Sequence, residues 1–399
     1  MVSIPLPSGF RFAGIASGIK ASGKRDISLI VSDTPATAAG VYTQNLVVAA
    51  PVVLCRSRTP RSDVRAVIVN SGNANACTGE KGAQDALQMC SLVAEACGND
   101  FTQEQVLVMS TGVIGRTLPM PKVQFGIQQA ASALGSDESC FLNAADAILT
   151  TDAGRKISST EIDLGGRVIR LVAMAKGAGM IGPNMATMLC CVLTDAALTS
   201  EQAHRLLQQA ADMSFNNISV EGHTSTNDTM LLLANGQSGG PALSQQEEAA
   251  FLDQLTNMTI ELAKQIPSDG EGATHLIEIQ VTGAQSEQGA RKIASTVANS
   301  NLVKTAIHGA DPNWGRIVSA AGYAGVEIST AHLSLRVNGF QLFSNGEPID
   351  FDAKAASNSI RDNRETLIEL QVGAGLAKCT HWTSDLTAEY VRFNSEYTT

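Results

Sequence analysis

Thr187 is the residue of this chain whose surroundings best suit nucleophilic chemistry. It lies where a loop rich in glycine, proline and asparagine, residues 176–185, runs into an apolar, strand-forming stretch from Ala186 to Leu193. Glycine and proline interrupt regular structure, whereas the apolar stretch predicts a buried strand. A hydroxyl at such a junction is held by rigid structure on one side and is approached through unhindered backbone on the other. The stretch therefore indicates a threonine nucleophile.

A threonine hydroxyl is a weak nucleophile and needs a base to remove its proton. The six histidines are scattered, and the sequence contains neither an H-E-x-x-H motif nor a G-x-S-x-G elbow. The economical base is the α-amine of Thr187 itself, which exists only once the preceding peptide bond is broken. An α-amine has a pKa of about 7.7–8.0, so a substantial part of it is neutral near neutral pH. This pattern favours acyl exchange at an N-terminal threonine.

Two further segments carry candidate site residues at the ends of predicted strands. Thr111 and Gly112 follow a predicted strand, residues 105–109, and offer a hydroxyl and an unhindered backbone N–H of the kind that an oxyanion site needs. Glu271 lies where a glycine-containing loop, residues 269–274, meets another predicted strand. Each segment also has a plain structural interpretation, a strand-terminating turn for the first and a solvated surface acid for the second.

Two glycine-rich segments imitate nucleotide-binding motifs. Residues 177–182 match the dinucleotide fingerprint G-x-G-x-x-G, but Pro183 and a strand-forming stretch follow where the fingerprint needs a helix. A dinucleotide-binding protein therefore stays a minor alternative. Residues 18–24 imitate a phosphate-binding loop, but Arg25 stands where that loop needs a Ser or Thr.

The composition is that of a well-buried globular protein. The chain has 399 residues, of which 44% are hydrophobic and 17% are charged, enough for one large domain or two. Its formal charge of −10 argues against nucleic acid or an anionic membrane as a partner, so small molecules are the expected ligands. The eight cysteines contain no C-x-x-C pair, and neither a metal site nor a disulfide framework is predicted. The first residues lack the features of a signal peptide, and we expect a cytoplasmic protein.

The pattern of elements predicts layered sheets and helices. Helices are expected at residues 83–97 and 144–149 and after two capping boxes, Thr199-x-x-Gln202 and Ser244-x-x-Glu247. Besides the stretch after Ala186, strands are expected at residues 27–31, 64–69, 105–109, 229–234, 276–281, 333–337 and 367–372. Because these elements do not alternate in a regular βαβ rhythm, we expect a layered α/β or α+β fold rather than one doubly wound domain.

Several motifs together resemble the ornithine acetyltransferase family of arginine biosynthesis. The main ones are KGAGM and PNMATML within residues 176–189, STGVIG at 110–115, DGEGAT at 269–274 and DPNWGR at 311–316. Supporting pieces are NSGNAN at 70–75, TSTND at 224–228 and the tail from Asn394. The matches follow the family's order from Gly9 to the last residue.

The resemblance implies an N-terminal-nucleophile fold, a sandwich of sheets and helices, and a precursor that cleaves itself between Ala186 and Thr187. Residues 1–186 and 187–399 would fold together as two fragments, and two such pairs would form a heterotetramer. Carried over residue by residue, Thr187 is the nucleophile, Thr111 and Gly112 form the oxyanion hole, and the substrate-binding positions are Thr150, Lys176, Thr187, Glu271, Asn394 and Thr399.

The reaction that the resemblance implies is transfer of an acetyl group from N-acetyl-L-ornithine to L-glutamate. It requires no metal and no cofactor, and acetyl-CoA is a candidate second acetyl donor. His223 and His275 depart from the family pattern, which favours Asp and Lys there, and we interpret both as ordinary loop or strand-end histidines. An alternative function is that of a self-processing aminopeptidase of related fold. Such an enzyme would share Thr187 and its base but would hydrolyse the acyl-enzyme instead of transferring the acyl group to an amine.

Overall fold

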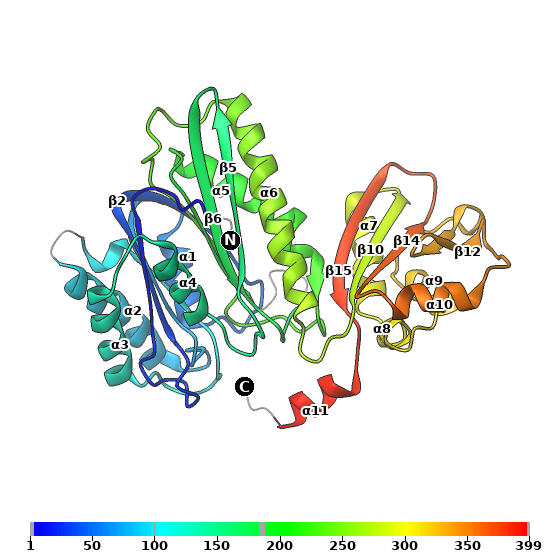
Figure 1. Cartoon of the computed structure of the whole chain (residues 1–399), viewed down its shortest axis with the longest axis horizontal. Helices are drawn as coiled ribbons and strands as arrows, with labels where there is room; N and C mark the ends of the chain where they lie inside the picture. Colours follow the sequence, from blue (N-terminus) through cyan, green and yellow to red (C-terminus); the bar gives the residue numbers. More distant parts are fainter. Residues whose placement is uncertain (1–3, 99–100, 183–187, 397–399) are drawn as a thin grey trace.

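The computed structural model describes residues 4–98, 101–182 and 188–396 of the chain. Within these ranges the elements form two lobes, each built on one mixed β-sheet with helices packed against it (Figure 1). This arrangement confirms the expected layered α/β fold.

The first lobe is built on a sheet with the strand order β4-β3-β2-β9-β7-β6-β5, and β1 pairs with β2. Its strands are β1 (Phe10–Ile15), β2 (Ile27–Tyr42), β3 (Arg61–Asn70), β4 (Val106–Ser110), β5 (Lys156–Leu164), β6 (Arg167–Lys176), β7 (Leu189–Thr194) and β9 (Thr229–Ala234). Its helices are α1 (Ala50–Arg58), α2 (Gly79–Cys97), α3 (Met120–Ser132), α4 (Glu138–Ala147), α5 (Ser200–Met213) and α6 (Gln245–Ser268).

The centre of this sheet is buried on both faces, which explains why its strands are continuous apolar runs in the sequence. In β7, Leu189, Cys191 and Leu193 join the core that packs against α1 to α4. Cys190 and Val192 point the other way and join the core that packs against α5 and α6. The strand that follows the predicted nucleophile in the sequence is therefore held from both sides.

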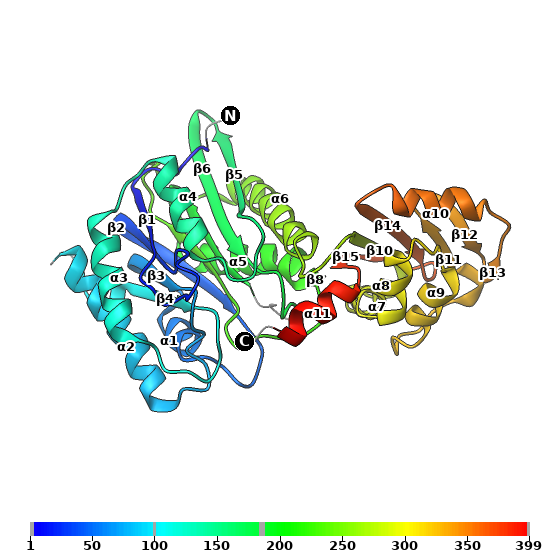
Figure 2. The same ribbon diagram turned by 60° about the horizontal axis from the view of Figure 1, so that its bottom comes forward.

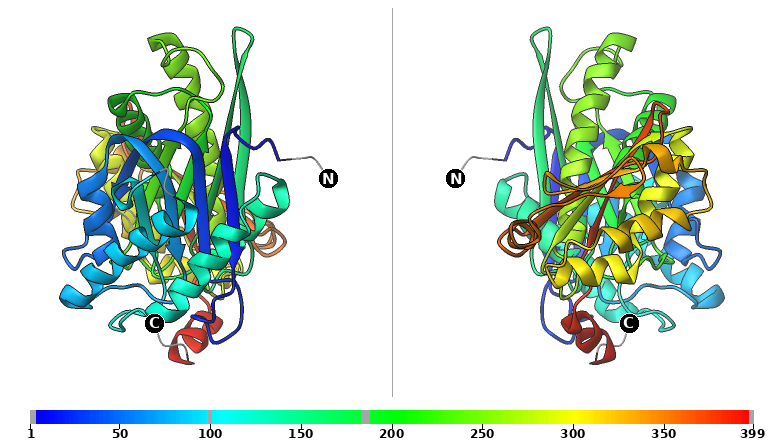
Figure 3. Two further views of the ribbon diagram at one scale, coloured as in Figure 1. Left: turned by 90° about the vertical axis from the view of Figure 1, so that its left-hand side faces the viewer. Right: turned by 90° about the vertical axis from the view of Figure 1, so that its right-hand side faces the viewer.

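The second lobe is built on a sheet with the order β13-β12-β11-β14-β10-β15-β8. Its strands are β8 (Ile218–Ser219), β10 (Leu276–Ala284), β11 (Ser334–Val337), β12 (Phe340–Ser344), β13 (Glu347–Pro348), β14 (Glu365–Gln371) and β15 (Ala377–Ser384). Its helices are α7 (Glu287–Ala298), α8 (Asn301–His308), α9 (Trp314–Gly322) and α10 (Ala353–Arg361). The yellow helices α7, α8 and α9 pack beside one another, as the right-hand view of Figure 3 shows.

The chain does not end in the second lobe. After β15, helix α11 (Ala388–Glu396) leaves the second sheet and lies below the junction of the two lobes (Figures 1 and 2). It thereby brings residues from the end of the sequence to loops that belong to the first lobe.

Many of these helices and strands were predicted from the sequence, but several of their ends were predicted incorrectly. The capping boxes at Thr199 and Ser244 are confirmed, and so is the strand at residues 229–234. The predicted strand 27–31 is wrong in length, because β2 continues to Tyr42 through a polar stretch where its register with β3 shifts. The helix predicted at 144–149 is α4, which begins at Glu138 after its cap, Asp137, and ends at Ala147.

The boundary between the two lobes is a different feature from the predicted cleavage site between residues 186 and 187. The first sheet takes β1 to β6 from one side of that position and β7 and β9 from the other, so both predicted fragments contribute strands to it. Apart from the short strand β8, which lies before β9 in the sequence and pairs with β15, the strands of the second sheet begin with β10, after α6. Among the described helices, none is long and apolar enough to cross a membrane.

Candidate active site

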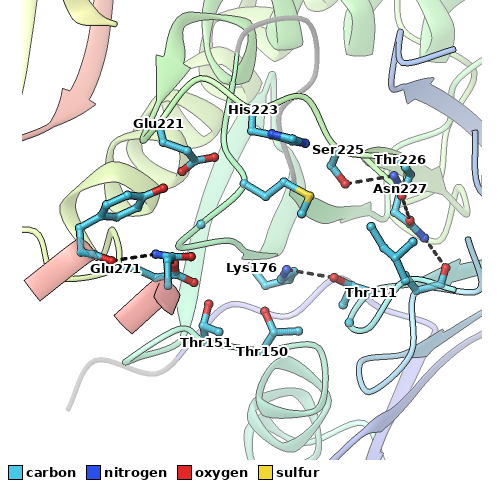
Figure 4. A pocket seen from close by; sticks show the side chains of 17 residues that line it. Thr111, Thr150, Thr151, Lys176, Glu221, His223, Ser225, Thr226, Asn227 and Glu271 are labelled. Carbon is cyan, nitrogen blue, oxygen red and sulfur yellow. Dashed lines mark hydrogen bonds between the residues drawn. The ribbon is translucent and has the colours of Figure 1, made fainter. Parts of the chain in front are cut away.

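A cavity of about 170 Å³ lies where loops of the first lobe meet the loop before β10 and helix α11. It is lined by all the predicted site residues that the structure describes, namely Thr111, Gly112, Thr150, Lys176, Glu271 and Asn394. Their positions in the sequence are far apart, and the fold brings them together (Figure 4). Ala186, Thr187 and Thr399 lie outside the described residues.

Thr111 and Gly112 follow β4 in a tight turn that only glycine can complete. The Thr111 amide donates to the Asn70 carbonyl at 3.0 Å, which fixes the start of the turn. Gly112 has a φ of +128°, and a Cβ atom there would lie 2.6 Å from the Asn73 nitrogen and from the Gly72 carbonyl carbon. Both contacts are with backbone, so a larger residue could not fit without moving the loop.

Lys176 is the last residue of β6, and its side chain is buried beside Thr111. Its Nζ donates to Thr111 Oγ1 at 3.1 Å. An ammonium group can only donate, so the hydrogen of the Thr111 hydroxyl remains available for another acceptor. Burial lowers the pKa of Lys176, while the nearby Asp152 carboxylate opposes this effect. The two residues form one polar unit on the cavity wall.

Asp152 is a positioning residue that the sequence did not single out. Its carboxylate accepts from the Thr150 amide at 2.9 Å and from the Gly177 amide at 2.6 Å, which joins the two loops on either side of the cavity. The buried Lys156 pairs with it at 2.7 Å and also reaches Asp269 at 2.6 Å. Burial alone would raise the pKa of Asp152, but Lys156 and Lys176 hold it at about 2. Asp152 is therefore ionised.

The loop before β9 supplies a further wall and anchors the strand β7. Asn227 donates through Nδ2 to the carbonyls of Ala74 at 2.6 Å and Ser110 at 2.8 Å. Asp228 accepts from the Met188 amide at 3.2 Å, and burial raises the pKa of this carboxyl group well above its usual range. The TSTND motif in the sequence pointed to this loop, although it assigned no role to Asn227 or Asp228.

Glu271 and Asn394 join the second lobe and α11 to the cavity. Asn394 Nδ2 donates to Glu271 Oε2 at 3.0 Å, and the Glu271 amide donates to the Ala178 carbonyl at 3.0 Å. The Glu271 carboxyl group packs so closely on Gly179 that a Cβ there would lie 2.5 Å from it. Gly179 of the KGAGM motif leaves room for this position of the carboxyl group, which supports the interpretation of Glu271 as more than a surface acid.

The two unusual histidines have different surroundings. His223 lines the cavity, whereas His275 is not among its lining residues and lies beside Asp385, with His275 Nδ1 and Asp385 Oδ2 3.4 Å apart. Glu221 and Tyr390 are among the cavity-lining residues that the sequence did not predict, because neither carries a motif of its own.

The described part of the chain contains no cluster of three or more His, Cys, Asp or Glu that could hold a metal ion. The dinucleotide interpretation of residues 177–182 also lacks support. Gly182 itself is not in a helix, residues 183–187 lie outside the described part of the chain, and the next described element is the strand β7. The glycines there serve the approach of Glu271 and of the Gly222 backbone instead.

Comparison with known proteins agrees with the resemblance seen in the sequence. A family model described as the ArgJ family matches residues 11–399. A relative from Rhodopirellula baltica, named arginine biosynthesis bifunctional protein ArgJ, is 53% identical over 99% of this chain and 96% of its own. A relative of the same name from Symbiobacterium thermophilum is 47% identical over 99% of this chain and 98% of its own. A crystal structure of arginine biosynthesis bifunctional protein ArgJ from Bacillus halodurans is 36% identical, with a TM-score of 0.50, and covers 51% of this chain and 96% of that chain. The chain belongs to the ArgJ family.

Proposed function

We propose that this chain transfers an acetyl group from N-acetyl-L-ornithine to L-glutamate, in arginine biosynthesis, by way of an acetyl ester on Thr187. The curated relatives are named for arginine biosynthesis, which supports the pathway. The observation that carries the proposal is the convergence of the predicted oxyanion and substrate-binding residues in one cavity. One substrate is an N-acetylated amino acid and the other a free amino acid, and we expect the reaction to take place in the cytoplasm.

The chemistry requires that the chain first cleaves itself between Ala186 and Thr187, which frees the α-amine of Thr187 as a base. This amine accepts the proton of the Thr187 hydroxyl while the oxygen attacks the acetyl carbonyl carbon. The Thr111 hydroxyl and the Gly112 N–H donate to the oxygen on which negative charge develops. The bond to the ornithine nitrogen then breaks, and that nitrogen takes the proton from the base. The neutral α-amine of glutamate attacks the ester and reverses these steps.

The charges of the cavity suit two α-amino acids bound in turn. Lys176 offers a cation for the α-carboxylate that both substrates share, and Thr150 offers a hydroxyl beside it. Glu271, held by Asn394, offers a carboxylate for the side-chain ammonium of ornithine. Thr399 stays a proposed substrate contact from the resemblance alone.

The surroundings of the proposed cleavage site support a nucleophile beside the cavity. Leu189, two residues after Thr187 in the sequence, pairs with Lys176 in the sheet. Met188 follows Thr187 directly and is fixed by Asp228. The solved chain from Bacillus halodurans is about half as long as this one, which is the length expected of one product of cleavage near residue 186. We propose that the two fragments stay together and that two pairs form a heterotetramer, which native mass spectrometry would measure.

The self-cleavage is tested by the intact mass of the denatured protein. We expect two fragments, residues 1–186 and 187–399, and we expect Thr187→Ala to give one uncleaved, inactive chain. An active preparation that contains only a full-length chain would contradict the proposal.

The covalent exchange is tested by steady-state kinetics with acetylornithine and glutamate. Parallel double-reciprocal lines and an acetyl adduct on the fragment that begins at Thr187 are expected. Intersecting lines without an adduct would reject the covalent route. Release of acetate without glutamate, or cleavage of small peptides, would favour the aminopeptidase alternative.

We also propose that acetyl-CoA acts as a second acetyl donor, which is favoured by the word bifunctional in the names of the curated relatives. Acetylation of Thr187 by acetyl-CoA alone, followed by mass spectrometry of the fragment, measures this activity directly. The absence of an adduct under conditions in which acetylornithine gives one would limit the chain to the exchange reaction.

A further inference from the structure

Glu221 is a buried carboxyl group on the cavity wall for which the reaction described above has no use. It follows the short strand β8, and its backbone is fixed because the amides of Val220 and Gly222 both donate to the Ile181 carbonyl at 2.9 Å. Both of its carboxyl oxygens are buried, and neither has a hydrogen-bond partner of normal geometry among the described residues. A buried carboxylate without a partner is costly, so such a group is either protonated or awaits a ligand.

The position of Glu221 in the cavity is opposite the proposed oxyanion hole. Figure 4 shows Glu221 and Glu271 on one side and Thr111 on the other, with Lys176 between them. A substrate with its acetyl group near Thr111 and its α-carboxylate near Lys176 would therefore extend its side chain toward the two carboxyl groups.

The balance of charges leaves Glu221 able to gain or lose a proton near neutral pH. Burial raises the pKa of Glu221 to about 7, and the Glu271 carboxylate adds to this rise, whereas the Ile181 amide and Lys304 oppose it. Lys304 does not neutralise Glu221 by a direct ion pair, because its Nζ donates to the Val220 carbonyl and, at 3.3 Å, to Thr383 Oγ1. Burial also lowers the pKa of Lys304 to about 8.

The other groups near Glu221 are Tyr390 from α11 and His223 from the same loop. Burial, with help from Glu221 and Glu271, raises the pKa of Tyr390 to about 12, so its hydroxyl stays neutral. Glu271 already accepts a hydrogen bond from Asn394, so its environment differs from that of Glu221. Of these two carboxyl groups, Glu221 is the one whose oxygens have no hydrogen-bond partner of normal geometry among the described residues.

The proposed exchange requires this end of the cavity to bind side chains of opposite charge. The side chain of ornithine ends in an ammonium group, whereas the side chain of glutamate ends in a carboxylate, and the same cavity must hold them in turn. Two fixed carboxylates would attract the first and repel the second. We propose that Glu221 is the residue that determines this dual specificity: ionised, it accepts from the ornithine ammonium, and protonated, it donates its proton to the glutamate side-chain carboxylate. The proton is taken from solvent when glutamate binds and returns to solvent when ornithine binds.

This inference rests on the proposed function, and counting protons by calorimetry tests it separately. Binding of glutamate and of ornithine to the cleaved wild-type enzyme is measured at pH 7 in two buffers that differ in ionisation enthalpy. Because a pKa of about 7 leaves part of Glu221 protonated at that pH, we expect glutamate to take up, and ornithine to release, a fraction of a proton. Glu221→Gln should abolish both. The matched control is Glu389→Gln on α11, an exposed carboxylate paired only with Arg392 among the described residues, and it should change neither.

Kinetics with the same variants provide the second measurement. Glu221→Gln imitates the protonated state, so at pH 8 we expect it to raise the KM for acetylornithine about tenfold and to lower the KM for glutamate. The ratio of the glutamate KM of the wild type to that of the variant should rise with pH above 7, and titration of the glutamate amine cancels in this ratio. Wild-type binding without proton exchange, or a parallel change in both KM values, would overturn the inference. Formation of acetyl-Thr187 tests the exchange reaction itself. A failure of the proposed function can therefore be distinguished from a failure of the inference about Glu221.

Discussion

Replacement of Gly112 by alanine tests the proposed oxyanion hole most sharply, because the structure also provides a matched control. The added Cβ would lie 2.6 Å from backbone atoms of Gly72 and Asn73, and neither neighbour can rotate away as a side chain could. The loop must then shift by a substantial part of an ångström, which moves the N–H that donates to the oxyanion. A misplacement on the order of 1 Å costs about 10²-fold in rate, so we expect kcat to fall by roughly that factor.

The control is Gly115→Ala in the same loop. Gly115 also has a positive φ, +77°, but no atom lies within 4 Å of the added Cβ. This variant should lose about 1 kcal/mol of stability from backbone strain and should keep its kcat. The assay is turnover of acetylornithine with glutamate per cleaved chain, after intact mass has shown the cleaved fraction and urea unfolding the stability. A Gly112→Ala enzyme with normal kcat, or an equal fall of kcat in both variants, would refute the role of the Gly112 N–H.

Three further predictions concern neighbouring residues. Thr111→Ala should lower kcat by roughly 10²–10³-fold. It should also cost about 1–3 kcal/mol of unfolding free energy, because the buried Lys176 ammonium loses this acceptor. Thr111→Ser should restore most of the rate because it returns the hydroxyl, and equal rates for the two variants would assign Thr111 a structural role. Asp152→Asn should lower the unfolding free energy measured in urea by roughly 3 kcal/mol. This is the lower end for a broken buried ion pair, because Asp269 still contacts Lys156. The control, Glu161→Gln at an exposed ion pair, should lower it by less than about 1 kcal/mol. Since the pKa of Asp152 falls from 3.8 to about 2 on folding, its stabilisation of roughly 2 kcal/mol is present above pH 4 and is lost as the pH falls toward 2. Below pH 4, the unfolding free energy should therefore fall more steeply with decreasing pH for the wild type than for Asp152→Asn. An equal fall for both proteins would contradict this role of the Asp152 carboxylate.

The sequence predicted helices and strands correctly where a local pattern of residues determines the structure. The apolar run of β9 has one physical explanation, a strand buried on both faces, and its ends were predicted correctly. The capping boxes at Thr199 and Ser244 were equally clear, because the side chain and backbone involved are three residues apart. The site residues were identified through family resemblance, and the structure describes six of them around one cavity.

What the sequence could not reveal depends on contacts between distant segments. Glu221 is an ordinary acidic residue in a turn until the loop around Ile181 and the second lobe bury it. Asp152 acquires its role only because Gly177 and Lys156 are brought to it. The length of β2 was hidden because a strand that continues through polar residues has no apolar alternation there to mark it.

The interleaving of strands in the first sheet determines whether folding or the proposed cleavage comes first. β7 and β9 lie between β2 and β6, so strands from beyond residue 187 are inserted among strands from before it. Neither half of the chain has a complete set of strand partners by itself, and each would expose bare sheet edges of the kind that aggregate. The proposed cleavage must then follow folding, which takes place while one covalent chain still brings every strand to its partner. If the chain is cleaved as proposed, its two fragments would refold poorly after the sheet opens, so the lifetime of the active enzyme would be set by the rate at which the sheet opens.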